Sequence, residues 1–164
     1  MSDSQFDPNL LLSAQTTDAN EKRDPLPAEN PADPSGFYVA TIAKVTAKSG
    51  TIGKGDRTGQ PWAAMNVQLK IDVPQQLRDT MGMPEAITLT DSCFLDLTPQ
   101  GAIDNTKGKN RRQRQYREAL GMNVAGEPWS WERAVGRPLK VKVNHKVSET
   151  TGDILEEPGL LMKV

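Results

Sequence analysis

Cationic side chains gather in one short stretch of the sequence, residues 107–117. Six of these eleven residues are Lys or Arg, although the 164-residue chain has a formal net charge of only −1. The six residues of this basic segment are Lys107, Lys109, Arg111, Arg112, Arg114 and Arg117. Such a cluster can bind an anionic partner, or it can be the solvated face of a short helix. The elements around the cluster decide how it can be used.

Further cations are expected on the polar faces of strands, close to aromatic rings. Lys140, Lys142 and Lys146 alternate with apolar residues that are expected inside, the last of them Val147, and Phe94 is an aromatic residue on an otherwise polar strand face. Cations that neutralise phosphates release counterions, and exposed rings stack on bases for about 1–3 kcal/mol each. Tyr38, Trp62, Phe94 and Trp129 are candidates for stacking, with Phe94 and Trp62 preferred. The pattern is typical of proteins that bind single-stranded nucleic acid, although lysines on an outer strand face are often only solvated.

The glycine-rich loop GTIGKGDRTGQ, residues 50–60, resembles a phosphate-binding loop only superficially. It lacks the G-x-x-x-x-G-K-[ST] order, and no helix follows it. It is therefore interpreted as a hairpin connection. Lys54 and Arg57 in this loop either contact phosphates or simply add soluble charge.

Residues suited to catalysis are sparse, and the sequence predicts no enzyme. His145 is the only histidine and is expected on the inward register of a strand, where a core or rim position is favoured over a role as a base. Cys93 is expected to be a packed thiol. One Cys and one His do not form a common structural zinc site. Asp91 is an unexplained carboxylate among the inward apolar residues of its strand, and Asp96 is expected on the opposite face, so the two do not form an acid/base pair. No cofactor or metal is predicted.

Alternation of apolar and polar residues predicts a mainly β domain. Clear period-two patterns occupy residues 64–73, 87–98 and 139–147, a β-rich segment covers 36–50, and a short strand is expected at 160–164. A helix is predicted from Asn110, as N-cap, to a stop at Gly121. Five strands with one helix between the third and fourth is the OB arrangement, so a five-stranded OB-like barrel is expected over residues 36–164.

The segment of residues 1–35, called the arm below, differs from the rest of the chain. It carries seven acidic and two cationic side chains, a net charge of −5, which leaves +4 for residues 36–164. Five prolines prevent long regular elements, so the arm is expected to be flexible or bound to a partner. Its apolar residues are predicted to dock on that partner, unless they are incidental in a disordered tail. They are Phe6, Leu10, Leu11 and Leu12.

Composition favours a soluble protein of a reducing compartment. A single cysteine excludes an internal disulfide framework. No apolar run approaches the roughly 20 residues that span a bilayer, and the start MSDSQFDPN lacks a signal-peptide pattern. No membrane partner is expected.

The sequence from Phe94 to Lys146 resembles a family of small bacteriophage OB-fold proteins, among them single-stranded DNA-binding proteins found near replication and recombination genes. The shared features, in order, are FLDLT, D-N-x-K-G-K-N, a helix ending in E-A-L-G, then PWS, and a strand G-R-P-L-K-V-K-V. The resemblance covers about residues 36–150 and implies a non-enzymatic barrel that coats single strands in the host cytoplasm. The chain differs from many such binders by ending in PGLLMKV instead of an acidic tail.

The sequence therefore predicts a bacteriophage protein that binds single-stranded DNA without sequence preference during replication or recombination. The predicted nucleic-acid-binding residues are Lys54, Arg57, Trp62, Lys70, Phe94, Lys107, Lys109, Arg111, Arg114, Arg117, Lys140, Lys142 and Lys146. The alternative is a virion or assembly protein whose arm binds neighbouring subunits. A third option is an accessory subunit that inhibits or recruits a host enzyme through the acidic arm. A homo-oligomer, a preference for RNA, and replication or virion proteins as partners of the arm stay open.

Overall fold

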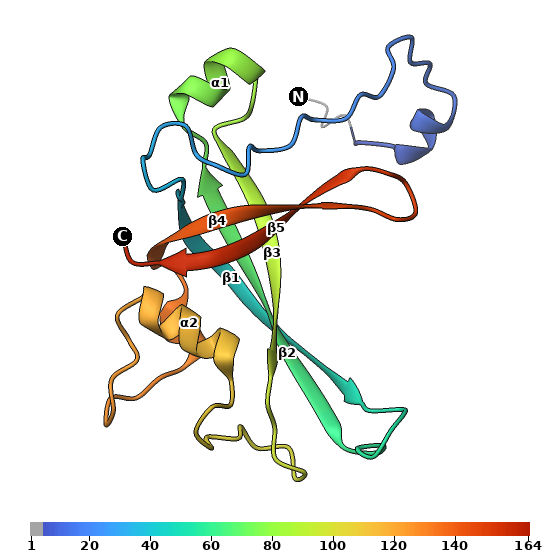
Figure 1. Ribbon diagram of the computed structural model, residues 1–164. Helices are drawn as coiled ribbons and strands as arrows, with labels where there is room; N and C mark the ends of the chain where they lie inside the picture. Colours follow the sequence, from blue (N-terminus) through green and yellow to red (C-terminus); the bar gives the residue numbers. More distant parts are fainter. Residues whose placement is uncertain (1–4) are drawn as a thin grey trace.

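Five antiparallel strands form one sheet in the computed structural model, which describes residues 5–164 (Figure 1). The strands are β1 (Tyr38–Thr51), β2 (Pro61–Asp72), β3 (Ala86–Leu95), β4 (Pro138–Val147) and β5 (Ile154–Met162). Their order in the sheet is β3-β2-β1-β4-β5. The predicted mainly β class with five strands is confirmed, and β5 begins six residues earlier than the pattern suggested.

The inner face of the sheet follows the alternation of the sequence. Ala40 of β1 pairs with Ile71 of β2, and Leu69 of β2 pairs with Leu89 of β3, so that apolar residues line up across three strands. Leu139, Val141 and Val143 of β4 complete this face, and all of these side chains are buried. Burial of apolar area on one face is the main force that fixes the register, since a slip by one residue would expose the whole set.

Closure of the sheet into a barrel is the part of the predicted fold that the structure does not confirm. β3 and β5 are the two edges of the sheet, and they contact each other. Among residues 5–164 they form no hydrogen-bonded ladder, so the sheet is open. The predicted closed barrel therefore stays a prediction.

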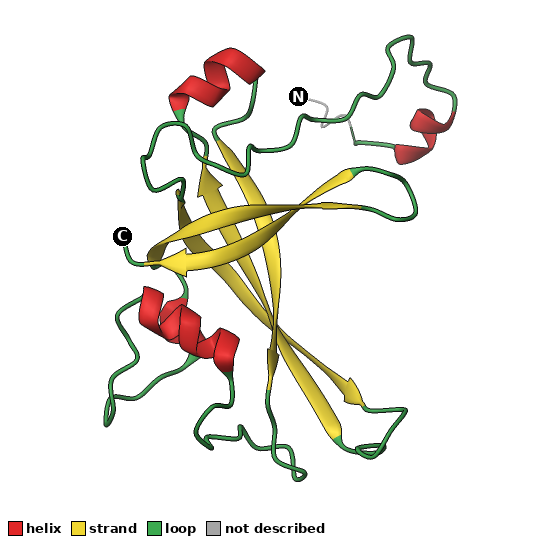
Figure 2. Cartoon of the chain, in the orientation of Figure 1, coloured by secondary structure: helices red, strands yellow, loops and turns green. Residues whose placement is uncertain are grey.

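Short helices lie in the arm and in the connections between strands (Figure 2). They are a 3₁₀ helix η1 (Pro8–Leu12) in the arm, α1 (Gln75–Met81), α2 (Arg111–Ala119) and α3 (Trp131–Ala134). The predicted helix is α2, whereas α1 and α3, of only one or two turns, were not predicted. No helix within the described residues is long and apolar enough to cross a membrane.

The two ends of α2 agree with the sequence to different degrees. Gly121 adopts φ 68° after the last turn, and its N–H donates to the carbonyl of Glu118 while the N–H of Met122 donates to that of Arg117. This is the Schellman arrangement that a glycine stop favours. At the other end, Asn110 precedes the helix as predicted but takes left-handed angles, φ 54° and ψ 49°, and its side chain does not cap the helix. The predicted capping role of Asn110 is wrong.

In the far half of the β4–β5 hairpin, two residues that were predicted to face inward are exposed. Val147 was predicted inside and His145 on the inward register, yet both are exposed. The hairpin continues past the core, so alternation there no longer separates a buried face from a solvated one. His145 instead contacts the arm, with its Nε2 2.7 Å from the carbonyl oxygen of Leu26.

The second half of the arm packs against the β4–β5 hairpin (Figure 1). Leu26 is fully buried in the core, and its backbone N–H donates to the Glu156 carboxylate at 2.9 Å. Lys22 and Arg23 form ion pairs with Asp153 and Glu156. The arm is thus tied to the sheet from residue 22 onward, whereas the boundary predicted at residue 35 stays a prediction.

Candidate functional site

An aromatic pair lies on the outer face of the sheet, the face away from the core. Phe94 of β3 is 61% exposed, and its ring centroid lies 5.9 Å from that of the half-buried Trp62 of β2, at an interplanar angle of 45°. Phe94 pairs with Ala64, which is two residues from Trp62, so the rings are diagonal neighbours across two strands. An exposed ring beside an indole is the kind of surface on which a nucleobase can stack.

The absence of a side chain at Gly50 makes room for the indole of Trp62 over β1. The two residues face each other in the β1–β2 ladder. A Cβ at position 50 would lie 2.6 Å from the indole Nε1 of Trp62, closer than atoms in contact can approach. Glycine at this position therefore leaves the space that the indole occupies.

Three lysines share the outer face with this aromatic pair. Lys48 faces Ala64, the partner of Phe94, while Lys44 faces Gln68 and Lys70 faces Thr41 further along the same two strands. In the part of the chain that the structure describes, these three lysines form no ion pair. Lys54 and Arg57 lie in the exposed loop between β1 and β2. We call the outer surface of Lys44, Lys48, Trp62, Lys70 and Phe94 the aromatic face. Sequence reasoning included Trp62, Lys70 and Phe94 but missed Lys44 and Lys48.

Arg112, in contrast, points toward the interior of the protein. Its Nε donates to the Asp91 carboxylate at 2.8 Å, and the hydroxyl of Tyr116 donates to the same oxygen at 2.6 Å. Asp91 stands on the inward register of β3, where the sequence pattern had left a carboxylate unexplained. Burial, followed by the nearby Asp91 charge, raises the pKa of Tyr116, so the phenol stays protonated as the donor. This ion pair links α2 to the sheet, so Arg112 is not one of the exposed cations of the basic segment.

Four residues of the basic segment line a polar cavity of about 280 Å³ at the start of α2. They are Lys107, Lys109, Arg114 and Arg117. Arg111 is exposed beside them, and Arg114 lies 3.7 Å from the Glu118 carboxylate in a solvent-exposed pair. Arg117 donates to the carbonyl of Met122 and stacks over the Trp129 ring at 5.4 Å. The solvent-exposed pair leaves Arg114 available to another anion, because such pairs are worth at most about 1 kcal/mol.

Asn110 positions the loop that carries Lys107 and Lys109. Its side-chain oxygen accepts the N–H of Asp96 at 2.8 Å, and its side-chain nitrogen donates to the carbonyl of Asp104 at 2.9 Å. Its own backbone N–H donates to the Asp96 carboxylate at 2.6 Å. Asn110 is buried, so these bonds replace water for each of its polar groups. The D-N-x-K-G-K-N motif is therefore a loop fixed to the end of β3.

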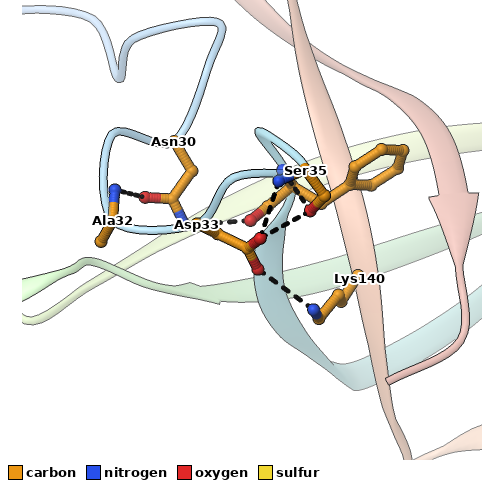
Figure 3. Close-up of polar contacts among 6 residues, drawn as sticks. Asn30, Ala32, Asp33, Ser35 and Lys140 are labelled. Atoms are coloured by element: carbon orange, nitrogen blue, oxygen red, sulfur yellow. Dashed lines mark hydrogen bonds and ion pairs between the residues drawn. The ribbon is translucent and has the colours of Figure 1, made fainter.

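The lysines of β4 are held by carboxylates of the arm. Lys140 lies 3.1 Å from Asp33 and Lys142 lies 2.9 Å from Glu29. Figure 3 shows the Asp33 contact within a tight turn, where Asp33 also accepts from the N–H and hydroxyl of Ser35. Lys146 is exposed further along β4. The structure thus separates the predicted binding residues into three groups, namely the aromatic face with its loop, the basic segment, and the β4 lysines beneath the arm.

Asp33 is expected to titrate near pH 2. The N–H and hydroxyl of Ser35, and then the Lys140 ammonium, lower the pKa of Asp33 from 3.8 to about 2. Since the folded-state pKa lies below the unfolded one, the contacts of the ionised carboxylate stabilise the fold above about pH 4 and are lost as the pH falls toward 2. An NMR titration of the Asp33 carboxyl carbon would measure the midpoint. Ser35→Ala and Lys140→Gln should each raise this midpoint, because each removes one group that lowers the pKa of Asp33, and a wild-type midpoint near 3.8 would contradict the turn geometry.

The apolar residues of the arm are exposed, as a docking segment requires. Phe6, Leu10, Leu11 and Leu12 lie in or beside η1 and are 62–87% exposed. Asp7 caps this 3₁₀ helix by accepting the N–H of Asn9 at 3.0 Å. Residues 13–21, between η1 and the tied half of the arm, are also exposed.

Both residues considered for catalysis are engaged within the protein. Burial, with the Asp91 charge as a second cause, raises the pKa of Cys93 to about 12, so the buried thiol carries no nucleophilic thiolate at neutral pH. His145 is engaged by the arm. Within residues 5–164, no three His, Cys, Asp or Glu side chains gather as a metal site would require.

These features define a mainly β protein with an open five-stranded antiparallel sheet and a cationic, partly aromatic outer surface. Comparison with known proteins adds no further identification, because no protein-family model and no curated protein matches the chain.

Proposed function

We propose that this protein binds single-stranded DNA without sequence preference and without catalysis, as a bacteriophage protein of replication or recombination in the host cytoplasm. The observation that carries the proposal is the aromatic face. There an exposed Phe94 and the neighbouring Trp62 lie beside lysines that form no ion pair with the described chain.

The architecture supports this function by its similarity to the OB fold. That fold is a five-stranded, partly open barrel in which the face of strands 2 and 3 and the loop between strands 1 and 2 bind oligonucleotides. Here Trp62 and Phe94 lie on β2 and β3, Lys54 and Arg57 lie in the β1–β2 loop, and α2 connects the third strand to the fourth. The proposed fold is therefore an OB-like barrel left open between β3 and β5.

In the proposed mode of binding, bases stack on Phe94 and Trp62 while phosphates contact Lys44, Lys48 and Lys70. Stacking is tolerant of sequence because every base has a π-face. The basic segment extends the path of the phosphates, since Lys107, Lys109, Arg111 and Arg114 are exposed. Lys140 and Lys142 have a smaller role in this proposal, because arm carboxylates already neutralise them.

Titration of a fluorescent oligo-dT at several salt concentrations tests the proposal. We expect micromolar or tighter affinity that falls steeply as salt rises, with weaker binding to duplex DNA. An affinity that does not change with salt concentration, or tighter binding to duplex than to single-stranded DNA, would exclude this function. A parallel titration with oligo-U measures the preference between DNA and RNA.

Replacing Arg111 and Arg114 together by alanine is expected to reduce the slope of log affinity against log salt by about two. Both side chains are exposed, and neither supports the core, so the fold should be unchanged. The matched control replaces Lys140 and Lys142, whose charges face Asp33 and Glu29, and should change the slope less. Equal slopes for wild type and the Arg111/Arg114 variant would show that the basic segment is only a solvated helix face.

The exposed arm supports a second candidate, a virion or assembly protein that uses the sheet as a packing module. Phe6 and the three leucines of η1 would then bind a neighbouring subunit. Copurification with particles, lost on deletion of residues 1–21 without loss of oligonucleotide binding, would favour this candidate, and this deletion spares the core residue Leu26.

A further inference from the structure

An apolar groove lies between the β1–β2 hairpin and α3. Its volume is about 620 Å³, and its lining is mostly apolar. The lining includes Val45 and Ala47 of β1, Met65 of β2, Ile103, Trp129 and Val135. The described chain leaves this groove empty, and none of these residues belongs to the aromatic face. A mostly apolar concavity of this size indicates a binding site.

The groove adjoins a cationic surface. Gln113 of α2 forms part of its wall and also part of the wall of the polar cavity that Lys107, Lys109 and Arg114 line. An occupant that fits both surfaces would combine apolar side chains with negative charge.

The arm of this chain has those properties. Phe6 and the leucines of η1 form an exposed apolar cluster with Asp7 among them, in an arm whose net charge is −5. In Figure 1, η1 and α2 lie in different parts of the molecule, and no residue of η1 lines the groove, so a chain does not cover its own groove in this arrangement.

The exposed residues 13–21 provide the reach to another molecule. Nine extended residues span up to about 30 Å, and they start from the position where Lys22 is tied to Asp153. We propose that residues 6–12 of one copy dock in the groove of a second copy, with Asp7 close to the cations at the start of α2. This contact joins two different surfaces, so it can build a reciprocal dimer or a chain of subunits. It goes beyond the proposed DNA binding and does not depend on it.

Light scattering of the full-length protein across a concentration series tests the contact. The wild-type mass should rise with concentration from 18.0 kDa to at least twice that value. The arm variant Leu11→Asp/Leu12→Asp and the groove variant Val135→Asp should each stay at the monomer mass, because each loses one side of the contact. Circular dichroism checks the folding of each variant, and Ala47→Glu, at an exposed groove position, replaces Val135→Asp if that variant does not fold.

Mixing the two variants gives the sharper result. The arm variant retains an intact groove and the groove variant an intact arm, so the mixture should form a 1:1 pair although neither associates alone. Leu160→Asp, on an equally exposed apolar residue of β5, is the matched control and should associate like the wild type. The proposal is overturned if the wild type stays monomeric at about 1 mM, where an interaction of about 4 kcal/mol would be visible. Variants that associate normally, or a mixture that stays monomeric, overturn it as well.

Discussion

Replacing Phe94 by alanine is expected to weaken binding of a single-stranded oligonucleotide by about 5- to 150-fold, which corresponds to about 1–3 kcal/mol of stacking. Phe94 is the exposed ring of the aromatic face, and its side chain contributes little to the core. Affinity measured by fluorescence anisotropy at fixed salt would give the loss. The salt slope should stay close to the wild-type value, because no cation is removed.

Phe6→Ala provides the matched control for this prediction. Phe6 is an equally exposed aromatic residue, but it lies in the arm and away from the lysines of the outer face. Its removal should leave the affinity within about twofold of wild type, the scatter expected of a neutral surface change. Equal losses for Phe6→Ala and Phe94→Ala would contradict the assignment of stacking to the aromatic face.

Replacing Asp91 by alanine is expected to lower the free energy of unfolding by about 3 kcal/mol. Asp91 accepts hydrogen bonds from both Arg112 and Tyr116, and its loss leaves a partly buried guanidinium and a buried phenol without their acceptor. Removal of one member of a buried pair costs more than the pair contributes, since the other charge stays desolvated. Urea denaturation at neutral pH, followed by circular dichroism, would measure the effect.

Asp72→Ala is the control for the Asp91 variant. Asp72 is an exposed carboxylate on β2, and it forms no ion pair with the described chain, so its removal should change stability by less than about 0.5 kcal/mol. Asp91→Asn keeps an acceptor and should fall between the two variants. Similar midpoints for the Asp91→Ala and Asp72→Ala proteins would show that the ion pair does not stabilise the contact between α2 and the sheet.

The sequence predicted the sheet well where one face is buried along the whole strand. Val67, Leu69 and Ile71 alternate with polar residues and pack inward as expected. The same reasoning assigned Phe94 to the outer face, which the structure confirms. It was wrong for Val147, because the β4–β5 hairpin extends beyond the core and solvent reaches both of its faces.

The proposed binding surface was less predictable because it depends on irregularities and on distant contacts. The register of β1 shifts between Ile42 and Lys44, so simple alternation does not show that Lys44 and Lys48 join the outer face. The pairing of Lys140 with Asp33 links residues 107 positions apart, which no local pattern reveals. Asp91, in contrast, was recognised as unusual, and only its partners on α2 were missing.

The contact between Leu26 and Glu156 also affects how the protein folds during synthesis. The backbone N–H of Leu26 donates to Glu156 of β5, 130 residues later, so this contact forms only after β5 has been synthesised. Until then the nascent polypeptide must keep the unpaired edge of β4 exposed to the cell. Contacts of such long sequence separation slow folding, and the delay leaves the unpaired strand edge open to proteases and aggregation.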